Sequence, residues 1–137
     1  MSQKLATISL LVPDYDEAID YYVGTLGFSL LEDSDLGGGK RWVRVAPQGK
    51  DGNTTGAVLL LAKAANDAQR AQIGTQAGGR VFLFLETDDF FGDYAAYKAR
   101  GVEFLEEPRQ EPYGWVAVFR DKFGSLWDFI QPSATSS

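Results

Sequence analysis

The sequence predicts an α+β fold of two tandem βαβββ modules, whose curved mixed sheets surround a cleft and carry their helices on the outside. The first observation is an internal repeat: "VPDYDEAIDYYVGTLGFSLLE" at 12–32 and "TDDFFGDYAAYKARGVEFLE" at 87–106. Each copy has an acidic cluster, an aromatic-rich amphipathic stretch, a glycine and an apolar run that ends in glutamate. Gly27 and Gly101 are 74 positions apart, as are the two closing glutamates. A period of about half the chain indicates two copies of one supersecondary unit, each too small to bury a good core alone.

A second pair of matching segments extends the repeat. "RWVRV" begins at Arg41 and "GWVAV" begins at Gly114, so Trp42 and Trp115 are 73 positions apart and are expected to hold equivalent places in the two halves. Two packed units of this kind usually create a cleft, and clefts are where small-molecule sites form. We therefore expect the functional site between the halves.

Composition places limits on function. The 137 residues suit one domain, 1–137, and 45% hydrophobic residues are enough for a packed core. The net charge of −6 disfavours nucleic acid and anionic membranes as partners. The chain shows neither a membrane-length apolar run nor a signal peptide, so we expect a cytoplasmic protein. Cysteine and histidine are absent, which excludes disulfides, thiolate metal sites and Ser-His-Asp or Cys-His catalysis within one chain.

The first half shows each element of the module in order. Leu5–Val12 alternates polar and apolar residues and is β-branched, which predicts a strand. Asp14 or Asp16 can cap the following helix, and Gly27 can end it in a left-handed conformation. Three further strands follow, at 28–32, 40–46 and 57–63, with a hairpin connection at 37–39.

The second half repeats this order after a polar connector at 64–79, which contains a short helix after Asn66 or Asp67. Asp88 or Asp89 is expected to cap the second long helix, and Gly101 to end it. Strands are predicted at 80–86, 102–105, 115–119 and 126–131, with a tight turn at Gly124. In the strand at 80–86, the residues on both faces are apolar, which predicts that both faces are buried.

This order of elements, together with three segments, resembles the vicinal oxygen chelate superfamily, which includes glyoxalase I, extradiol dioxygenases and bleomycin resistance proteins. The segments are "ISLLVPDYDEAIDYYVGTLGF" near the start, "FLETDD…YKARGVEF" at the second module and "FRDKFGSLWDFIQP" at the end. The similarity covers roughly residues 5–132. It implies one glyoxalase/bleomycin-resistance-like domain with modules at about 5–63 and 80–132.

The resemblance also identifies where metal-using members hold a divalent ion. By it, the four inward positions here fall on Thr7, Leu60, Phe82 and Asp128. Leucine and phenylalanine cannot ligate a metal, and one carboxylate cannot hold an ion that needs about three protein donors. We therefore expect no metal and no cofactor at this place.

Several residues are candidates for ligand binding instead. Asp128 can bind a cationic ligand, or act as an acid or base if there is catalysis, or be a vestigial acid. Phe82 and Phe84 can line an aromatic pocket or fill the space of a metal, and the two tryptophans can stack on a ligand or be core or dimer-interface residues. The remaining candidates are Arg44, for which a surface salt bridge is the common alternative, and Tyr113. The full predicted set is Thr7, Trp42, Arg44, Leu60, Phe82, Phe84, Tyr113, Trp115 and Asp128.

Three functions follow from these residues and the resemblance. The first is a metal-independent small-molecule-binding protein similar to bleomycin resistance proteins, a homodimer whose ligand is cationic or aromatic. The alternative is a lyase or dioxygenase of the same superfamily, with a non-standard metal site using Asp128 and Glu86, or with metal-free acid–base chemistry at Asp128. The third is an interaction module whose cavity is filled by its own Phe82, Leu60 and tryptophan side chains.

Overall fold

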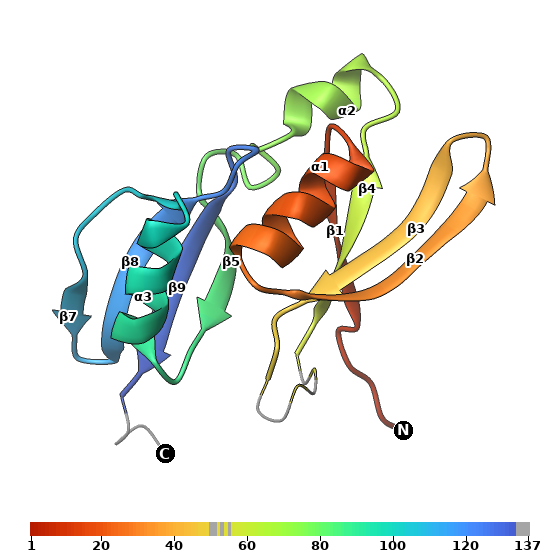
Figure 1. Ribbon diagram of the computed structural model, residues 1–137. Helices are drawn as coiled ribbons and strands as arrows, with labels where there is room; N and C mark the ends of the chain where they lie inside the picture. The colour runs from red at the N-terminus through yellow and green to blue at the C-terminus, as the bar shows by residue number, and fades with distance from the viewer. Residues whose placement is uncertain (50–51, 53, 55, 134–137) are drawn as a thin grey trace. The chain divides into compact units, whose positions relative to one another are not determined.

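A computed structural model of the chain describes residues 1–49, 52, 54 and 56–133. The chain forms two compact units, Met1–Ile73 and Gly74–Ser137 (Figure 1). Each unit has one mixed sheet, of four and five strands respectively, and few helices. The predicted α+β class is confirmed. No helix among the described residues is long and apolar enough to cross a membrane.

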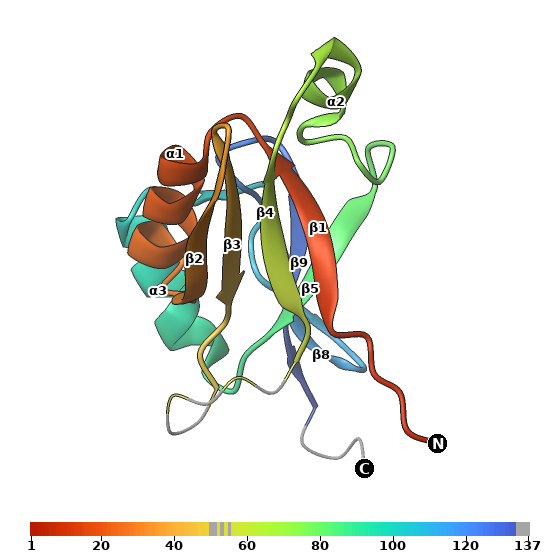
Figure 2. The same cartoon turned by 90° about the vertical axis from the view of Figure 1, so that its right-hand side faces the viewer.

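The sheet of the first unit has the strand order β1-β4-β3-β2, in which β1 and β4 are parallel and the other pairs are antiparallel (Figure 2). The turn between β2 and β3 lies at Gly37–Gly39, where all three glycines have positive φ, as the hairpin prediction requires. The strands are β1 (Thr7–Val12), β2 (Ser29–Gly37), β3 (Lys40–Ala46) and β4 (Val58–Lys63).

The long helix of this unit has two parts. Helix α1 (Tyr15–Ile19) begins at Asp14, whose carboxylate accepts a hydrogen bond from Glu17 N at 2.9 Å. A π-helical segment, η1 (Asp20–Thr25), continues it, and Leu26 N donates to the Tyr21 carbonyl oxygen five residues back. The sequence predicts a single helix here, because its apolar spacing does not distinguish a π turn from an α turn. A third helix, α2 (Asp67–Gln72), is capped by Asn66 as predicted.

The second unit has the strand order β5-β9-β8-β6, and β7 also pairs with β8. Strands β5 and β9 are parallel, like β1 and β4. Asp89 caps α3 through Gly92 N. The elements are β5 (Val81–Glu86), α3 (Phe90–Ala99), β6 (Glu103–Phe104), β7 (Arg109–Glu111), β8 (Gly114–Arg120) and β9 (Leu126–Pro132).

Strand β7 is absent from the sequence prediction, which has one strand at 102–105 between the helix and β8. The edge breaks before Pro108, because proline has no N–H to donate to a strand ladder. Leu105 N donates to the Val118 carbonyl oxygen, and the Glu106 side chain then accepts from Val118 N at 3.2 Å. A carboxylate thus replaces a backbone acceptor, and the chain resumes pairing with β8 at Arg109.

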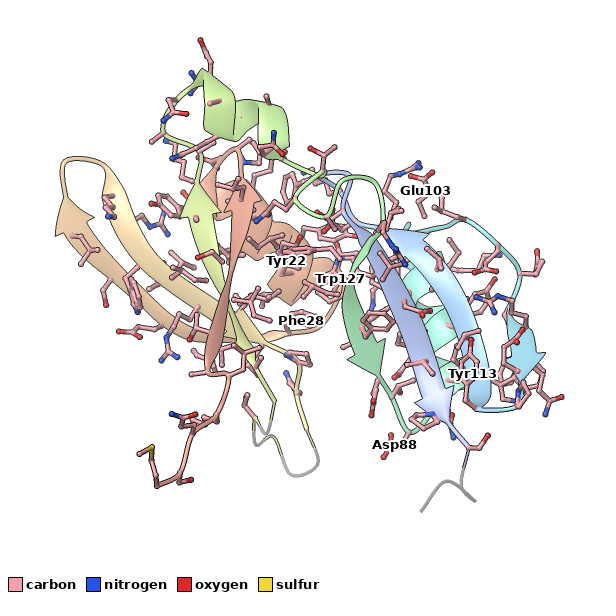
Figure 3. The ribbon with its side chains drawn as sticks, turned by 180° about the vertical axis from the view of Figure 1, so that it is seen from behind. Tyr22, Phe28, Asp88, Glu103, Tyr113 and Trp127 are labelled. Atoms are coloured by element: carbon pink, nitrogen blue, oxygen red, sulfur yellow. The ribbon has the colours of Figure 1, made fainter. Side chains whose placement is uncertain are left out.

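Each sheet packs one face against its own helix. In the first unit the buried face is aliphatic, with Leu10, Val43, Val45 and Leu61 at most 1% exposed. Tyr22 and Phe28 add an aromatic contact, with ring centroids 6.1 Å apart (Figure 3).

The core of the second unit is aromatic. Phe90 of α3 stacks on Phe129 at 5.2 Å, and Phe119 stacks on Trp127 at 5.6 Å. Buried aromatic pairs add about 0.5–1.5 kcal/mol each beyond their area burial, so this cluster anchors α3 on the sheet.

The predicted burial of both faces of β5 is wrong. Phe84 is 69% exposed, whereas its neighbour Leu85 is 7% exposed. Strand alternation sends Leu85 to the helix side with its partner Phe129, and sends Phe84 to the opposite side with its partner Asp128. An apolar run alone does not show which of its faces is covered.

A buried aspartate holds the turn between β8 and β9. Asp121 is 3% exposed, and its carboxylate accepts from Phe123 N and Ser125 N at 3.0 Å and from Trp127 Nε1 at 2.9 Å. Gly124 in this turn has φ of 103°, as predicted. The turn sets where β9 begins and therefore where Asp128 lies.

Replacing Asp121 with alanine should destabilise the protein by about 3 kcal/mol, because three donors lose their buried acceptor. Urea unfolding followed by tryptophan fluorescence measures the change. Asp67→Ala is the control, since Asp67 is fully exposed in its pair with Arg70, and it should leave the midpoint nearly unchanged. Equal midpoints for the two variants would contradict this role of Asp121.

Candidate functional site

The face of each sheet opposite its own helix, called here the helix-free face, carries most of the predicted binding residues. In the first unit, Leu60 is paired with Arg44 on one side and with Ser9 on the other. Paired residues share a face, and so do residues two apart on one strand. Thr7, Trp42, Arg44 and Leu60 therefore lie on the same helix-free face. Whether a cleft forms between the halves stays a prediction.

Glu32 holds two side chains of this face in place through hydrogen bonds. Its Oε1 accepts hydrogen bonds from Trp42 Nε1 at 3.1 Å and from Arg44 Nε at 2.9 Å. Arg44 thus forms the salt bridge that the sequence offered as its alternative role. The bond occupies only the Nε side of the guanidinium.

The helix-free face of the second unit centres on Asp128. This residue is paired with Phe84 of β5 and Val118 of β8. Its Oδ1 is buried and has no hydrogen-bond partner within the described part of the chain. Burial raises the pKa of Asp128 above its ordinary value; Arg109 opposes this rise and Glu106 adds to it.

A cluster around Arg109 borders this aspartate. Arg109 Nε bonds Glu106 Oε2 at 2.8 Å, and Nη1 lies 3.1 Å from Glu111 Oε1. Hydrogen bonds to Glu106, Tyr113 and Glu111 raise the pKa of the guanidinium further above its usual range. With Asp128 the cluster holds three carboxylates and one guanidinium, so its net charge is negative. This environment favours a cation.

Tyr113 lies at the turn between β7 and β8 (Figure 3) and is 50% exposed. The next residue, Gly114, has φ of 149°, and a Cβ there would collide with the Gln131 carbonyl oxygen. Only glycine suits this turn, which holds Tyr113 next to Arg109.

The sequence alone does not identify Glu106, Arg109 and Glu111 as site residues. These residues can be assigned to the site only once β7 is known. Arg109 pairs with Val116 in that strand and therefore lies on the helix-free face. The run "EEPRQE" reads from sequence as a charged loop before a proline. Without the strand register, nothing in that run assigns its side chains to a face.

The predicted equivalence of Trp42 and Trp115 is wrong. Trp115 lies on the helix side of its sheet, where its ring is 4.8 Å from Phe91 and 6.4 Å from Phe90. Trp42 lies on the helix-free face. A shift of one residue reverses the face of a strand side chain, so the 73-residue spacing of the tryptophans puts them on opposite faces, whereas Val43 and Ala117, 74 residues apart, are both buried on the helix side.

The four positions that the family resemblance assigns to a metal ion do not suit one in this chain. Leu60 and Phe82 have no donor atom, and Phe82 lies in an irregular stretch of β5, where the register shifts between Val81 and Leu83. Among the described residues there is no group of three or more Asp and Glu side chains placed to hold a metal ion. A single carboxylate, Asp128, is left at these positions.

An open cavity of about 360 Å³ lies at the β2–β3 turn, away from the predicted residues. Arg41 lines this cavity and binds Asp33 through Nε and Nη2, at 3.1 and 2.7 Å, and Asp16 through Nη1. The hydrogen bond from Arg41 lowers the pKa of Asp33. These contacts tie the hairpin to α1 and have a structural role.

Comparison with known proteins agrees with this geometry. Residues 4–129 match the family model of the Glyoxalase/Bleomycin resistance protein/Dioxygenase superfamily. An uncharacterized protein from Shewanella frigidimarina (strain NCIMB 400) is 50% identical over 132 residues, which cover 96% of this chain and 95% of that protein.

Two solved structures are similar over nearly the whole chain. UcmS2 matches with a TM-score of 0.78 at 26% identity, covering 95% of this chain and 98% of that one. TnmS3, described as an antibiotic binding protein from Streptomyces sp. CB03234, matches with a TM-score of 0.72 at 34% identity, covering 97% and 98%. With its two βαβββ-type units and this family match, the chain belongs to the Glyoxalase/Bleomycin resistance protein/Dioxygenase superfamily.

Proposed function

We propose that this protein binds an organic cation that carries an aromatic or other flat apolar group, and that it does so without a metal ion. One observation carries the proposal: Oδ1 of Asp128 is buried and has no hydrogen-bond partner among the described residues, and Phe84, its pairing partner on β5, is exposed. A buried carboxylate oxygen without a donor costs free energy, and a cation bound beside this carboxylate would offset that cost. An exposed phenyl ring beside it offers a surface for an apolar group or a cation.

Two further points support this function. The cluster of Asp128, Glu106, Glu111 and Arg109 has excess negative charge, which favours a cationic ligand. The similar protein TnmS3 is described as an antibiotic binding protein, a class in which a small molecule is bound. By this reading the chain acts as bleomycin resistance proteins do, by sequestering a compound.

The other predicted residues have supporting places in this proposal. Tyr113 would donate or accept a hydrogen bond beside Arg109, and Phe82 would extend the apolar surface of Phe84. Trp115 is proposed only as support, since its ring packs under the sheet against α3. The homodimer and the cytoplasmic location stay predictions, the first of which sedimentation velocity tests.

A second candidate function is acid–base catalysis at Asp128, which the raised pKa of this group favours. A metal-free lyase of the same superfamily would use it in this way. The two functions are separated by recovering the ligand after prolonged incubation with the protein. Unchanged ligand supports sequestration, and a new product supports catalysis.

The first prediction concerns ligand charge. Asp128→Asn should weaken binding of 2-naphthylmethylammonium about tenfold or more, because the charged hydrogen bond is lost. Isothermal titration calorimetry measures this. The neutral analogue 2-naphthalenemethanol should bind both proteins equally weakly.

Asp88→Asn is the matched control, because it removes the same charge from an exposed position (Figure 3). It should leave the affinity for the ammonium compound within about twofold, as expected for a screened surface charge. Equal losses in the two variants, or no binding of aromatic amines and bleomycin-type cationic glycopeptides to the parent protein, would contradict the proposal.

The second prediction concerns stability and pH. The pKa of Asp128 is raised in the folded state, so ionisation of this group costs folding free energy at any pH above the ordinary aspartate pKa. Asp128→Asn should therefore raise the melting temperature at pH 7. The advantage should shrink as the pH falls and vanish below about pH 4, where both states are protonated. Calorimetric melting across pH 3–8 tests the sign; destabilisation at pH 7 would refute it.

The third prediction concerns metal. Protein purified without chelators should not contain a stoichiometric amount of Zn, Ni, Mn or Fe per chain, because the side chains of Leu60 and Phe82 offer no ligand atoms. Ligand affinity should be the same with and without EDTA. A stoichiometric divalent ion in mass-spectrometric elemental analysis would overturn metal independence and favour a non-standard site.

A further inference from the structure

The helix-free face of the first unit contains a second arrangement with a different charge. Arg44 and Trp42 are two residues apart on β3, and Glu32 and Ser34 are their partners on β2. Because Glu32 Oε1 accepts from both Trp42 Nε1 and Arg44 Nε, one carboxylate holds the indole and the guanidinium in fixed orientations. A planar ring and a planar cation are thereby set side by side.

The outer edge of Arg44 is available to a ligand. Within the described residues, Nη1 and Nη2 of Arg44 have no hydrogen-bond partner, and its side chain is 30% exposed. Arg41 differs, since its Nε, Nη1 and Nη2 all bond aspartates. The two terminal nitrogens of a guanidinium match the two oxygens of a carboxylate, and Glu32 leaves that edge free.

Trp42 supplies an apolar surface beside this edge. Its side chain is 38% exposed, and within the described residues it makes no ring–ring contact, unlike Trp115 and Trp127. Leu60 lies opposite Arg44 on β4 and adds aliphatic surface. An indole that is fixed by its N–H and open on a face can stack on a flat ligand with little loss of entropy.

The local charge allows an anion here. Glu32 balances Arg44, so this face starts near neutrality, whereas the Asp128 cluster has two more carboxylates than guanidiniums. We infer that this face binds an aromatic carboxylic acid, with its carboxylate on Nη1 and Nη2 of Arg44 and its ring on Trp42. This site is separate in its chemistry from the cation-binding face and does not depend on it.

The test follows the indole N–H signal of Trp42 in ¹H–¹⁵N spectra during titration with 2-naphthoate. The Trp42→Phe variant assigns the signal among the three tryptophans. We expect the Trp42 signal to shift saturably at concentrations up to about 10 mM, the range of a weak single-site ligand. The Trp115 and Trp127 signals should move little, because both rings pack against the helix side of their sheet.

Variants separate the recognition of charge from that of shape. Arg44→Met should weaken 2-naphthoate binding about tenfold or more. Arg44→Lys should restore only part of the lost affinity, because an ammonium group cannot make the two parallel hydrogen bonds of a guanidinium to a carboxylate. Arg120→Met is the matched control, since Arg120 also pairs across strands with a glutamate, Glu103, but has no exposed tryptophan beside it. It should bind 2-naphthoate like the parent protein.

Three results would overturn the inference. They are an unmoved Trp42 signal, equal binding by the Arg44→Met and parent proteins, and equal binding of 2-naphthamide and 2-naphthoate. Each variant's spectrum also reports whether it is folded, and Arg44→Lys keeps the test decisive if Arg44→Met does not fold. This inference and the proposed function can fail independently, because 2-naphthoate and 2-naphthylmethylammonium carry opposite charges and are titrated separately.

Discussion

The parallel pairing of the first and last strands in each unit is the constraint on which the other features depend. It places β1 beside β4 and β5 beside β9, and the two-residue period of strands then assigns every side chain to one of two faces. Aliphatic and aromatic residues on one face bury α1 or α3. The residues on the other face, among them Leu60 and Asp128, are not needed to pack the helix. A shift of one residue in either pair would exchange core and site.

At Asp128 this arrangement places a carboxylate in a buried position that is unfavourable for its charge. Its position is set by the Asp121 turn and by its pairing with Phe84 and Val118, and its Oδ1 is buried with no donor in the described part of the chain. Folded proteins rarely keep such a group without a use, because an apolar residue of similar size would be more stable there. Under the proposed function, a bound cation would offset this electrostatic penalty.

The two halves share a topology and differ in charge. In the first unit one glutamate neutralises one arginine, and the indole of Trp42 stays exposed beside them. In the second unit the break before Pro108 lets Glu106 serve as a backbone acceptor, and β7 brings Arg109 and Glu111 to the same face. The two units thus share their sheet topology, while their helix-free faces differ in charge.

By itself the sequence determined the α+β class, the glycine hairpin and the family, and it narrowed the helix caps to Asp14 or Asp16 and to Asp88 or Asp89, because local backbone chemistry and a long repeat specify these features. It also predicts that the four positions assigned by the family resemblance lack a metal ligand set, since that prediction needs only residue identity. Only the tertiary structure decided that Trp42 and Trp115 face opposite sides, that Phe84 is exposed, and that Arg109 lies near Asp128. Those facts depend on strand register and on a break in an edge strand, and both are set by contacts between residues distant in the chain.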